Sequence, residues 1–221
     1  MKTPDPVAIE HSSHLLPRAA LLKVPRQERS VDMVHTILDA GTEVLQAEGM
    51  TAFTTNRVAK LAGVSVGSLY QYFANKDALL LGVIERGVMN ADAEVRKHLL
   101  GLELATAEAT LAALFQGMID LLQPRRALLQ EVLTTSPLLS ESGFLALVEG
   151  RFLDLLRQVA HRHGITEYEP VQIYVATNAT CFLLLKWLAD PSPYLGHDRF
   201  VATTAKLVVD TLGRTNDLRS L

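Results

Sequence analysis

The chain has 221 residues, 48% of them hydrophobic, which is enough to bury a substantial core and excludes a chain that is disordered throughout. Its net charge of −3 does not by itself indicate a nucleic-acid partner, and its single cysteine, Cys181, excludes an internal disulfide and fits a reducing compartment. The N-terminus lacks the pattern of a secretory signal, so we expect a soluble, cytoplasmic protein.

The N-terminal residues predict an arm followed by a helix. Residues 1–26 contain four prolines and no sustained hydrophobic period, and we expect them to form a flexible arm. From Gln27 apolar residues recur with helical spacing. Gly49 follows the last turn and suits the left-handed residue that ends a helix.

Two short helices separated by a glycine-containing turn are predicted next. Thr54 or Thr55 caps a helix that continues to Ala62, Gly63 makes the break, and Ser65 caps a third helix that ends near residue 72. Two short helices joined by such a turn are the signature of a DNA-binding helix-turn-helix. The window from residue 49 to 76 agrees with this prediction because it contains three basic residues and no acidic one.

The rest of the chain is predicted to be helical. Asn75 caps a long helix from Lys76 to near His98. Prolines and glycines then divide the sequence into helices at about 105–122, 124–133, 141–163, 170–189 and 198–213. The most apolar segment, 171–188, is interrupted by polar residues and predicts a buried helix rather than a membrane span.

No segment shows the alternation of a strand, so we expect an all-α fold. An N-terminal three-helix helix-turn-helix domain is expected to join a larger helical domain. The expected parts are the arm at 1–26, the helix-turn-helix domain at 27–75, and the larger domain at 76–221, in which helix 76–100 is the connector.

The third helix is expected to expose a small and polar side. Val58, Ala59 and Ala62 supply an apolar inner side to the second helix. Small residues on the outer side of the third helix permit a close approach to the major groove of DNA. The residues expected to face outward are Val66, Gly67, Ser68, Gln71 and Tyr72.

The stretch from Thr54 to Leu79, TTNRVAKLAGVSVGSLYQYFANKDAL, resembles the DNA-binding domain of the tetracycline-repressor (TetR) family. The family motif is approximately T-T-x-x-I-A-x-x-A-G-V-S-x-G-T-L-Y-x-Y-F-x-N-K-x-x-L, from which this chain departs at Val58 and Ser68. The resemblance implies that the phosphate-binding residues are Thr55, Tyr70, Tyr72 and Lys76. It implies that the residues facing base edges are Asn56, Val66, Gly67, Ser68 and Gln71, and Gln71 suits a bidentate bond to adenine. We also expect arm cations to reach phosphates or a minor groove: Arg18, Lys23, Arg26 and Arg29.

The resemblance further implies that the larger domain binds a small molecule and forms a homodimer. Its last two predicted helices are hydrophobic around most of their circumference, which favours burial on every side. The expected ligand residues are Phe115, Gln116, Ile119, Phe152, Asn178, Cys181 and Phe182. The expected dimerisation residues are Leu184, Trp187, Leu188, Val201, Ala205 and Val208. A two-fold dimer implies a near-palindromic operator in double-stranded DNA.

We find no phosphate loop, dinucleotide fingerprint or nucleophile elbow in the sequence, and therefore expect no enzyme activity, metal or cofactor. The favoured function is a bacterial repressor that leaves its operator when a small hydrophobic molecule binds the C-terminal domain. Two alternatives stay open. The first is a helix-turn-helix regulator controlled by a protein partner or by no ligand, and the second is a helical protein-interaction module that does not bind DNA.

Overall fold

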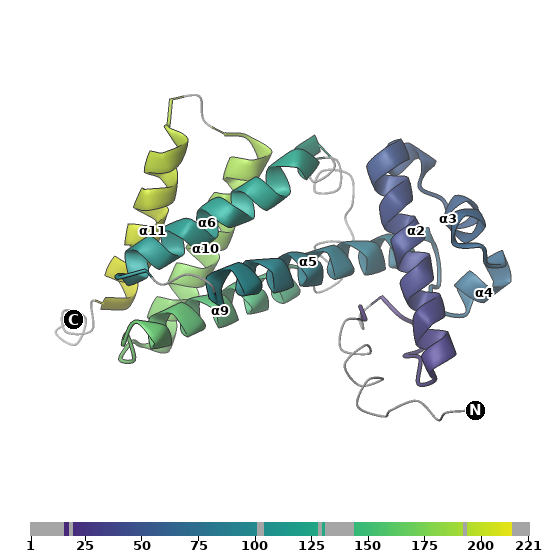
Figure 1. Cartoon of the computed structure of the whole chain (residues 1–221), viewed down its shortest axis with the longest axis horizontal. Helices are drawn as coiled ribbons and strands as arrows, with labels where there is room; N and C mark the ends of the chain where they lie inside the picture. The colour runs from purple at the N-terminus through teal and green to yellow at the C-terminus, as the bar shows by residue number, and fades with distance from the viewer. Residues whose placement is uncertain are drawn as a thin grey trace. The chain divides into compact units, whose positions relative to one another are not determined.

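The computed structural model describes residues 16–17, 20–100, 104–127, 130, 144–191 and 194–213. All the secondary-structure elements assigned in these ranges are helices, which confirms the predicted all-α fold (Figure 1). The chain divides into two compact units. The first unit comprises residues 1–90 and 127–145, and the second comprises 91–126 and 146–221.

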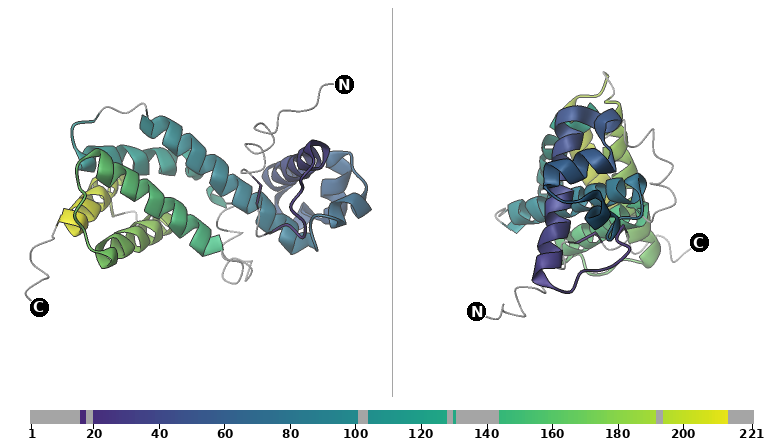
Figure 2. Two further views of the ribbon diagram at one scale, coloured as in Figure 1. Left: turned by 90° about the horizontal axis from the view of Figure 1, so that it is seen from below. Right: turned by 90° about the vertical axis from the view of Figure 1, so that its right-hand side faces the viewer.

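The first unit contains the helix-turn-helix. Its helices are α2 (Glu28–Ala52), α3 (Thr55–Ala62), α4 (Val66–Tyr70) and the first part of α5 (Lys76–Leu100). Helix α3 packs against both α2 and α4. Figure 2 shows the same short helices beside α2 from two further directions.

The predicted starts of three helices are confirmed by hydrogen bonds. The side chains of Thr54, Ser65 and Asn75 each accept a bond from the backbone N–H three residues later, at 3.1, 3.0 and 2.8 Å. These bonds satisfy N–H groups that have no partner inside the first turn of a helix. Gly63 ends α3 in the left-handed conformation with φ of 67°, and Gly49 kinks α2 with φ of 77°. The turn geometry is therefore set by residues next to each turn.

Two glycines allow α5 to pack closely on the first unit. A Cβ at Gly41 would lie 2.6 Å from Cγ2 of Val83, and one at Gly82 would lie 2.9 Å from the ring of Phe73 and 3.2 Å from Leu38. Since real Cβ atoms do not approach that closely, a larger residue would push the helices apart. The first half of α5 thus belongs to the same compact unit as the helix-turn-helix, and the division of the chain falls after Asn90 rather than before α5.

Part of the expected arm is packed rather than free. Leu16 and Ala20 are buried, and the backbone N–H of Leu22 donates to the carbonyl of Tyr72 at 2.9 Å. These contacts fix the segment that leads into α2. Residues 1–15, 18 and 19 of the expected arm, Arg18 among them, lie outside the described residues.

The second unit is built from the end of α5 and the later helices. Helix α6 packs against α10 and α11, and α10 packs against α11 (Figure 1). Only the start of the expected helix at 124–133 is described, as a short 3-10 turn and the residues after it. The elements are α6 (Ala107–Leu122), η1 (Gln123–Arg125), α9 (Phe144–Arg162), α10 (Pro170–Ala189) and α11 (His197–Gly213).

Helix α10 supplies much of the core of the second unit. It is the one helix in the described part of the chain that is long and apolar enough, by length and composition, to cross a membrane. Two of its buried polar residues bond within the unit, since Gln172 donates to the carbonyl of Thr211 at 2.8 Å and Thr177 to that of Ile173 at 2.7 Å, whereas the hydroxyl of Thr180 has no partner among the described residues. Since α10 packs on two neighbours and buries nine of its residues, it is the core helix that the sequence predicts.

Candidate nucleic-acid interface

The outer side of α4 is open to solvent. Leu69 is fully buried and anchors the five-residue helix, whereas Gly67 and Gln71 are exposed. Val66 and Ser68 are half-buried on the flanks. This arrangement leaves small side chains and one amide on the outer surface, which is the shape that a helix needs to approach base edges.

Two predicted phosphate-binding residues lie together beside α4. The hydroxyl of Thr55, at the start of α3, is 3.2 Å from the hydroxyl of Tyr70, at the end of α4. Tyr70 is 45% exposed, so its hydroxyl is accessible while the hydrogen bond restrains its position. Each hydroxyl has one donor and two acceptor positions, which leaves capacity for a phosphate oxygen.

Three further residues of this surface are exposed. Asn56 and Lys76 are predicted to contact DNA, and Lys60 is basic. Asn56 and Lys60 lie on α3, and Lys76 is the first residue of α5. Lys60 and Lys76 form no ion pair with any other described residue. The backbone N–H groups at the start of a helix and its positive dipole end add to the attraction of Lys76 for an anion.

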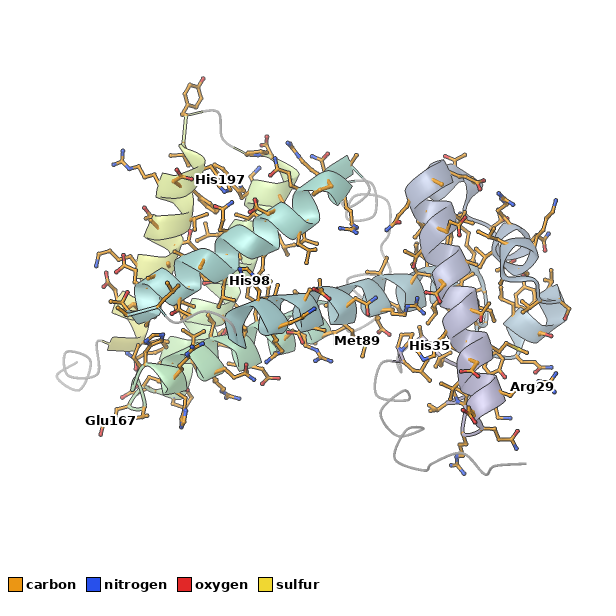
Figure 3. All side chains as sticks on the ribbon, in the orientation of Figure 1. Arg29, His35, Met89, His98, Glu167 and His197 are labelled. Carbon is orange, nitrogen blue, oxygen red and sulfur yellow. The ribbon has the colours of Figure 1, made fainter. Side chains whose placement is uncertain are left out.

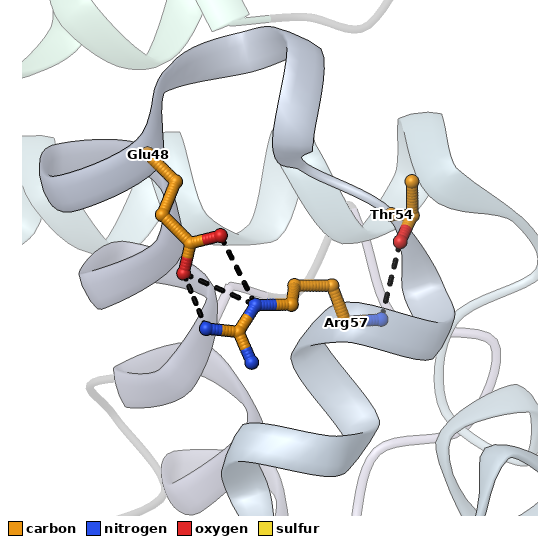
Figure 4. Close-up of polar contacts among 3 residues, drawn as sticks. All are labelled: Glu48, Thr54 and Arg57. Carbon is orange, nitrogen blue, oxygen red and sulfur yellow. Dashed lines mark hydrogen bonds and ion pairs between the residues drawn. The ribbon is translucent and has the colours of Figure 1, made fainter.

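Arg57 has a different role, shown in Figure 4. Its guanidinium Nε donates to both carboxylate oxygens of Glu48 at 3.1 Å, which links α3 to the last turns of α2. The hydrogen bond from Arg57 lowers the pKa of Glu48 below its ordinary value, and the same bond raises the pKa of Arg57. The pair therefore braces the two helices and reduces the positive charge available to DNA.

Tyr72 does not lie on the outer side of α4, contrary to the expectation that it faces outward. It is 7% exposed, because it lies three residues after the buried Leu69 and therefore on the same side of the helical turn. Helix α4 ends at Tyr70, but the backbone N–H groups of Tyr72 and Phe73 still donate to the carbonyl of Leu69 at 3.0 Å, and both side chains lie in the core with Leu69.

A second group of basic residues lies just before α2 and in its first turn. Lys23, Arg26 and Arg29 are exposed, and Arg29 is labelled in Figure 3. The bond between Leu22 and Tyr72 attaches this segment to the loop that follows α4. The segment therefore carries positive charge on the same compact unit as the recognition helix.

The expected ligand residues of the second unit differ in their exposure and in their hydrogen-bond partners. Gln116 is held by its neighbours, because it donates to Asp120 at 2.8 Å and bonds to the ring of His197 at 2.6 Å. Asn178 donates to the backbone carbonyl of Tyr174. Phe182 is 68% exposed and points away from the core. The four others are buried: Phe115, Ile119, Phe152 and Cys181.

A cavity of about 300 Å³ lies elsewhere in this unit, between the end of α5 and α6. It contains none of the seven expected ligand residues. Sequence reasoning missed an acid and a histidine four residues apart in the connector helix, where both lie on one side of the helix. The lining residues are Glu94, Val95, His98, Leu114, Gly117 and Leu121.

The six residues expected at a dimer interface are buried in the core of their own unit, at 0–8% exposure. Trp187, for example, stacks on Phe200 with ring centroids 4.2 Å apart. A helix that is apolar on all sides buries one side in the core of its own unit and leaves another side exposed. The sequence alone does not indicate which side is buried. The exposed apolar face of α10 and α11 consists of Val171, Tyr174, Val175, Phe182 and Leu207.

The fold and its surface define a class, a helix-turn-helix protein with a separate all-helical unit. Residues 37–83 match the sequence model of the bacterial regulatory proteins of the tetR family. The HTH-type transcriptional regulator SrpR of Pseudomonas putida is 29% identical over 155 residues, which cover 66% of this chain and 68% of SrpR. Three other curated relatives are matched over 30–49% of their length.

Solved structures show the same fold. The TetR family repressor AlkX from Dietzia sp. strain DQ12-45-1b superimposes with a TM-score of 0.60 at 20% identity, covering 81% of this chain and 97% of AlkX. FadR of Thermus thermophilus, solved in complex with lauroyl-CoA, gives a TM-score of 0.54 at 21% identity and covers 83% and 94% of the two chains. The chain thus carries a helix-turn-helix of the tetR family at residues 37–83 and is similar to TetR-family regulators in its longer sequence match and in its fold.

Proposed function

We propose that this protein is a ligand-responsive repressor that binds a near-palindromic operator as a homodimer in the bacterial cytoplasm and acts by binding rather than by catalysis. The observation that carries the proposal is the open outer side of α4, bordered by the bonded hydroxyls of Thr55 and Tyr70. Small side chains at the centre and hydroxyls at the edge suit a helix lying in the major groove between two phosphate chains.

We assign the contacts by chemistry. Thr55, Tyr70 and Lys76 bind phosphate oxygens, because hydroxyls and an ammonium group are donors that do not distinguish bases. Gln71 reads a base edge, because its amide both donates and accepts and can pair with adenine. Asn56, Val66, Gly67 and Ser68 stay predicted neighbours of the bases.

The exposed apolar face supports dimerisation. Val171, Tyr174, Val175 and Phe182 recur on one side of α10, and Leu207 is an exposed apolar residue of α11, which packs against α10. An apolar patch of this kind on a soluble protein marks an interaction surface. A two-fold dimer formed through it places two recognition helices roughly 34–36 Å apart, one turn of DNA.

Release of DNA by a small molecule is supported by the fold and by ligands seen in similar structures. FadR proteins of the same fold have been solved with lauroyl-CoA and with stearoyl-CoA. A ligand that favours one of two positions of α5 alters the spacing of the recognition helices and weakens operator binding. Coupling of about 1–3 kcal/mol is usual for such linkage.

Selection of bound sequences from random DNA tests the proposal. The purified protein is expected to enrich a near-palindromic site. The proposal fails if no sequence is enriched at low ionic strength, where phosphate contacts alone hold any DNA-binding protein on DNA.

A further inference from the structure

We propose that the cavity between α5 and α6 binds a small apolar molecule carrying a positive charge, with Glu94 as its counter-ion. This inference rests on the proposed function, in which the second unit senses an effector. It names the site and the chemical class of that effector.

The inner part of the cavity is apolar. Val95 and Leu114 are buried and form its floor, and Leu121 borders it. Gly117 opens the wall, since a Cβ at this position would meet nothing within 4 Å. A space lined by aliphatic side chains in this way favours an alkyl or aryl group.

The rim of the cavity is polar. Glu94 and His98 are exposed and lie one turn apart on α5, so that both border the same opening. Figure 3 labels His98 between α5 and α6. Neither side chain forms a hydrogen bond or an ion pair with another residue that the structure describes. Their polar groups are therefore available to a ligand.

The one carboxylate in the lining favours a cation. The lining contains one carboxylate and neither lysine nor arginine. Helix α6 carries two acidic residues and no basic one. The nearby acid Asp92 is paired with both Arg96 and Arg151, which donate to it at 2.9 and 3.2 Å, so its carboxylate is not left for a ligand. Glu94 is thus the carboxylate at the opening whose charge is left for a ligand, where it attracts an ammonium group and repels a carboxylate.

Three probes that have the same length of alkyl chain but different headgroups test this assignment: n-octylammonium, 1-octanol and octanoate. Titration calorimetry on the full-length protein should give the tightest binding for octylammonium and the weakest for octanoate, with a ratio of about tenfold for a partly solvated carboxylate. In Glu94→Gln this ratio should fall below about twofold while 1-octanol binds as before. Glu108→Gln, which removes the same charge from α6 outside the cavity lining, should keep the ratio.

Filling the cavity gives an independent test. Gly117→Leu should abolish binding of all three probes, whereas Gly117→Ala should keep it, and circular dichroism confirms that both variants fold. Octanoate binding as tightly as octylammonium, an unchanged ratio in Glu94→Gln, or no binding of any probe would overturn the assignment. Octylammonium that binds through Glu94 yet leaves operator affinity unchanged upholds the site and contradicts the proposed ligand-responsive repression.

Discussion

The two units expose their functional surfaces in different ways. In the first unit, the outer side of α4 is fixed by a buried leucine and by caps that lie within three residues of each turn. In the second unit, long helices are apolar on several sides, and packing decides which side stays exposed. A short, locally capped element therefore has a defined outer surface, whereas the surface of a long apolar helix depends on its neighbours.

The largest expected effect follows from removing the anchor of α4. Leu69→Ala should lower the free energy of unfolding by about 2–5 kcal/mol, because it leaves a cavity under the helix. Operator binding should be lost with it. Chemical denaturation and a gel-shift assay check both effects. Tyr70→Phe is the control, since it keeps the ring and removes only the hydroxyl; stability as low in this variant as in Leu69→Ala would contradict the anchoring role.

The exposed apolar face of α10 gives the next effect. Phe182→Glu should weaken the dimer by about 2–4 kcal/mol, because it places a charge in a desolvated contact. Analytical ultracentrifugation over a range of concentrations measures the dissociation. Gln158→Glu adds the same charge on α9 and should leave the dimer intact. An unchanged dimer in Phe182→Glu would show that another surface mediates association.

The sequence predicts the first unit in more detail than the second. Thr54, Ser65 and Asn75 identify their helix starts because a cap acts on its own turn. Tyr72 is wrongly predicted to face outward, although its spacing of three residues from the buried Leu69 places both on one side of a helix.

In the second unit, helix bounds are predictable and faces are not. Pro170–Ala189 is predicted to the residue because proline and the following loop mark its ends. Trp187 and Phe182 are both large aromatic residues, and either could line an interface or a pocket. Tertiary packing, which the sequence pattern does not show, buries Trp187 and exposes Phe182.

Glu85 offers a smaller effect that depends on pH. This carboxyl group of α5 is 4% exposed, its Oε2 has no partner among the described residues, and it accepts a bond from the backbone of Ala20. Burial raises its pKa from 4.5 to about 7. The folded state therefore holds this proton more tightly than the unfolded chain. The contribution of Glu85 to the free energy of unfolding is largest below pH 4.5, falls as the pH rises to about 7, and then levels off.

Glu85→Gln should remove this dependence. At pH 8 the variant should be more stable than the wild type by about 1–3 kcal/mol, an upper range set by the size of the pKa shift, while at pH 4 the two should differ little. Urea titrations at the two pH values measure the difference. Equal stability at pH 8 would mean that the carboxylate is solvated in the folded protein.

The smallest effects separate the contacts on the DNA surface. Lys76→Ala should weaken binding to all duplexes alike, by about 1 kcal/mol, and reduce the salt slope by about one. Gln71→Ala should relax the preference at one base pair and leave the salt slope unchanged. Fluorescence anisotropy with the selected site and its single-base variants measures both. A change in salt slope in Gln71→Ala would place this amide on a phosphate.

The central claim is that the outer side of α4 reads base edges, and the affinity ratio between the selected operator and a scrambled duplex tests it most directly. At near-physiological salt, anisotropy titrations should give at least a roughly thousandfold preference for the operator. Equal affinity for the two duplexes at every salt concentration would contradict the account, because binding would then come from phosphate contacts alone.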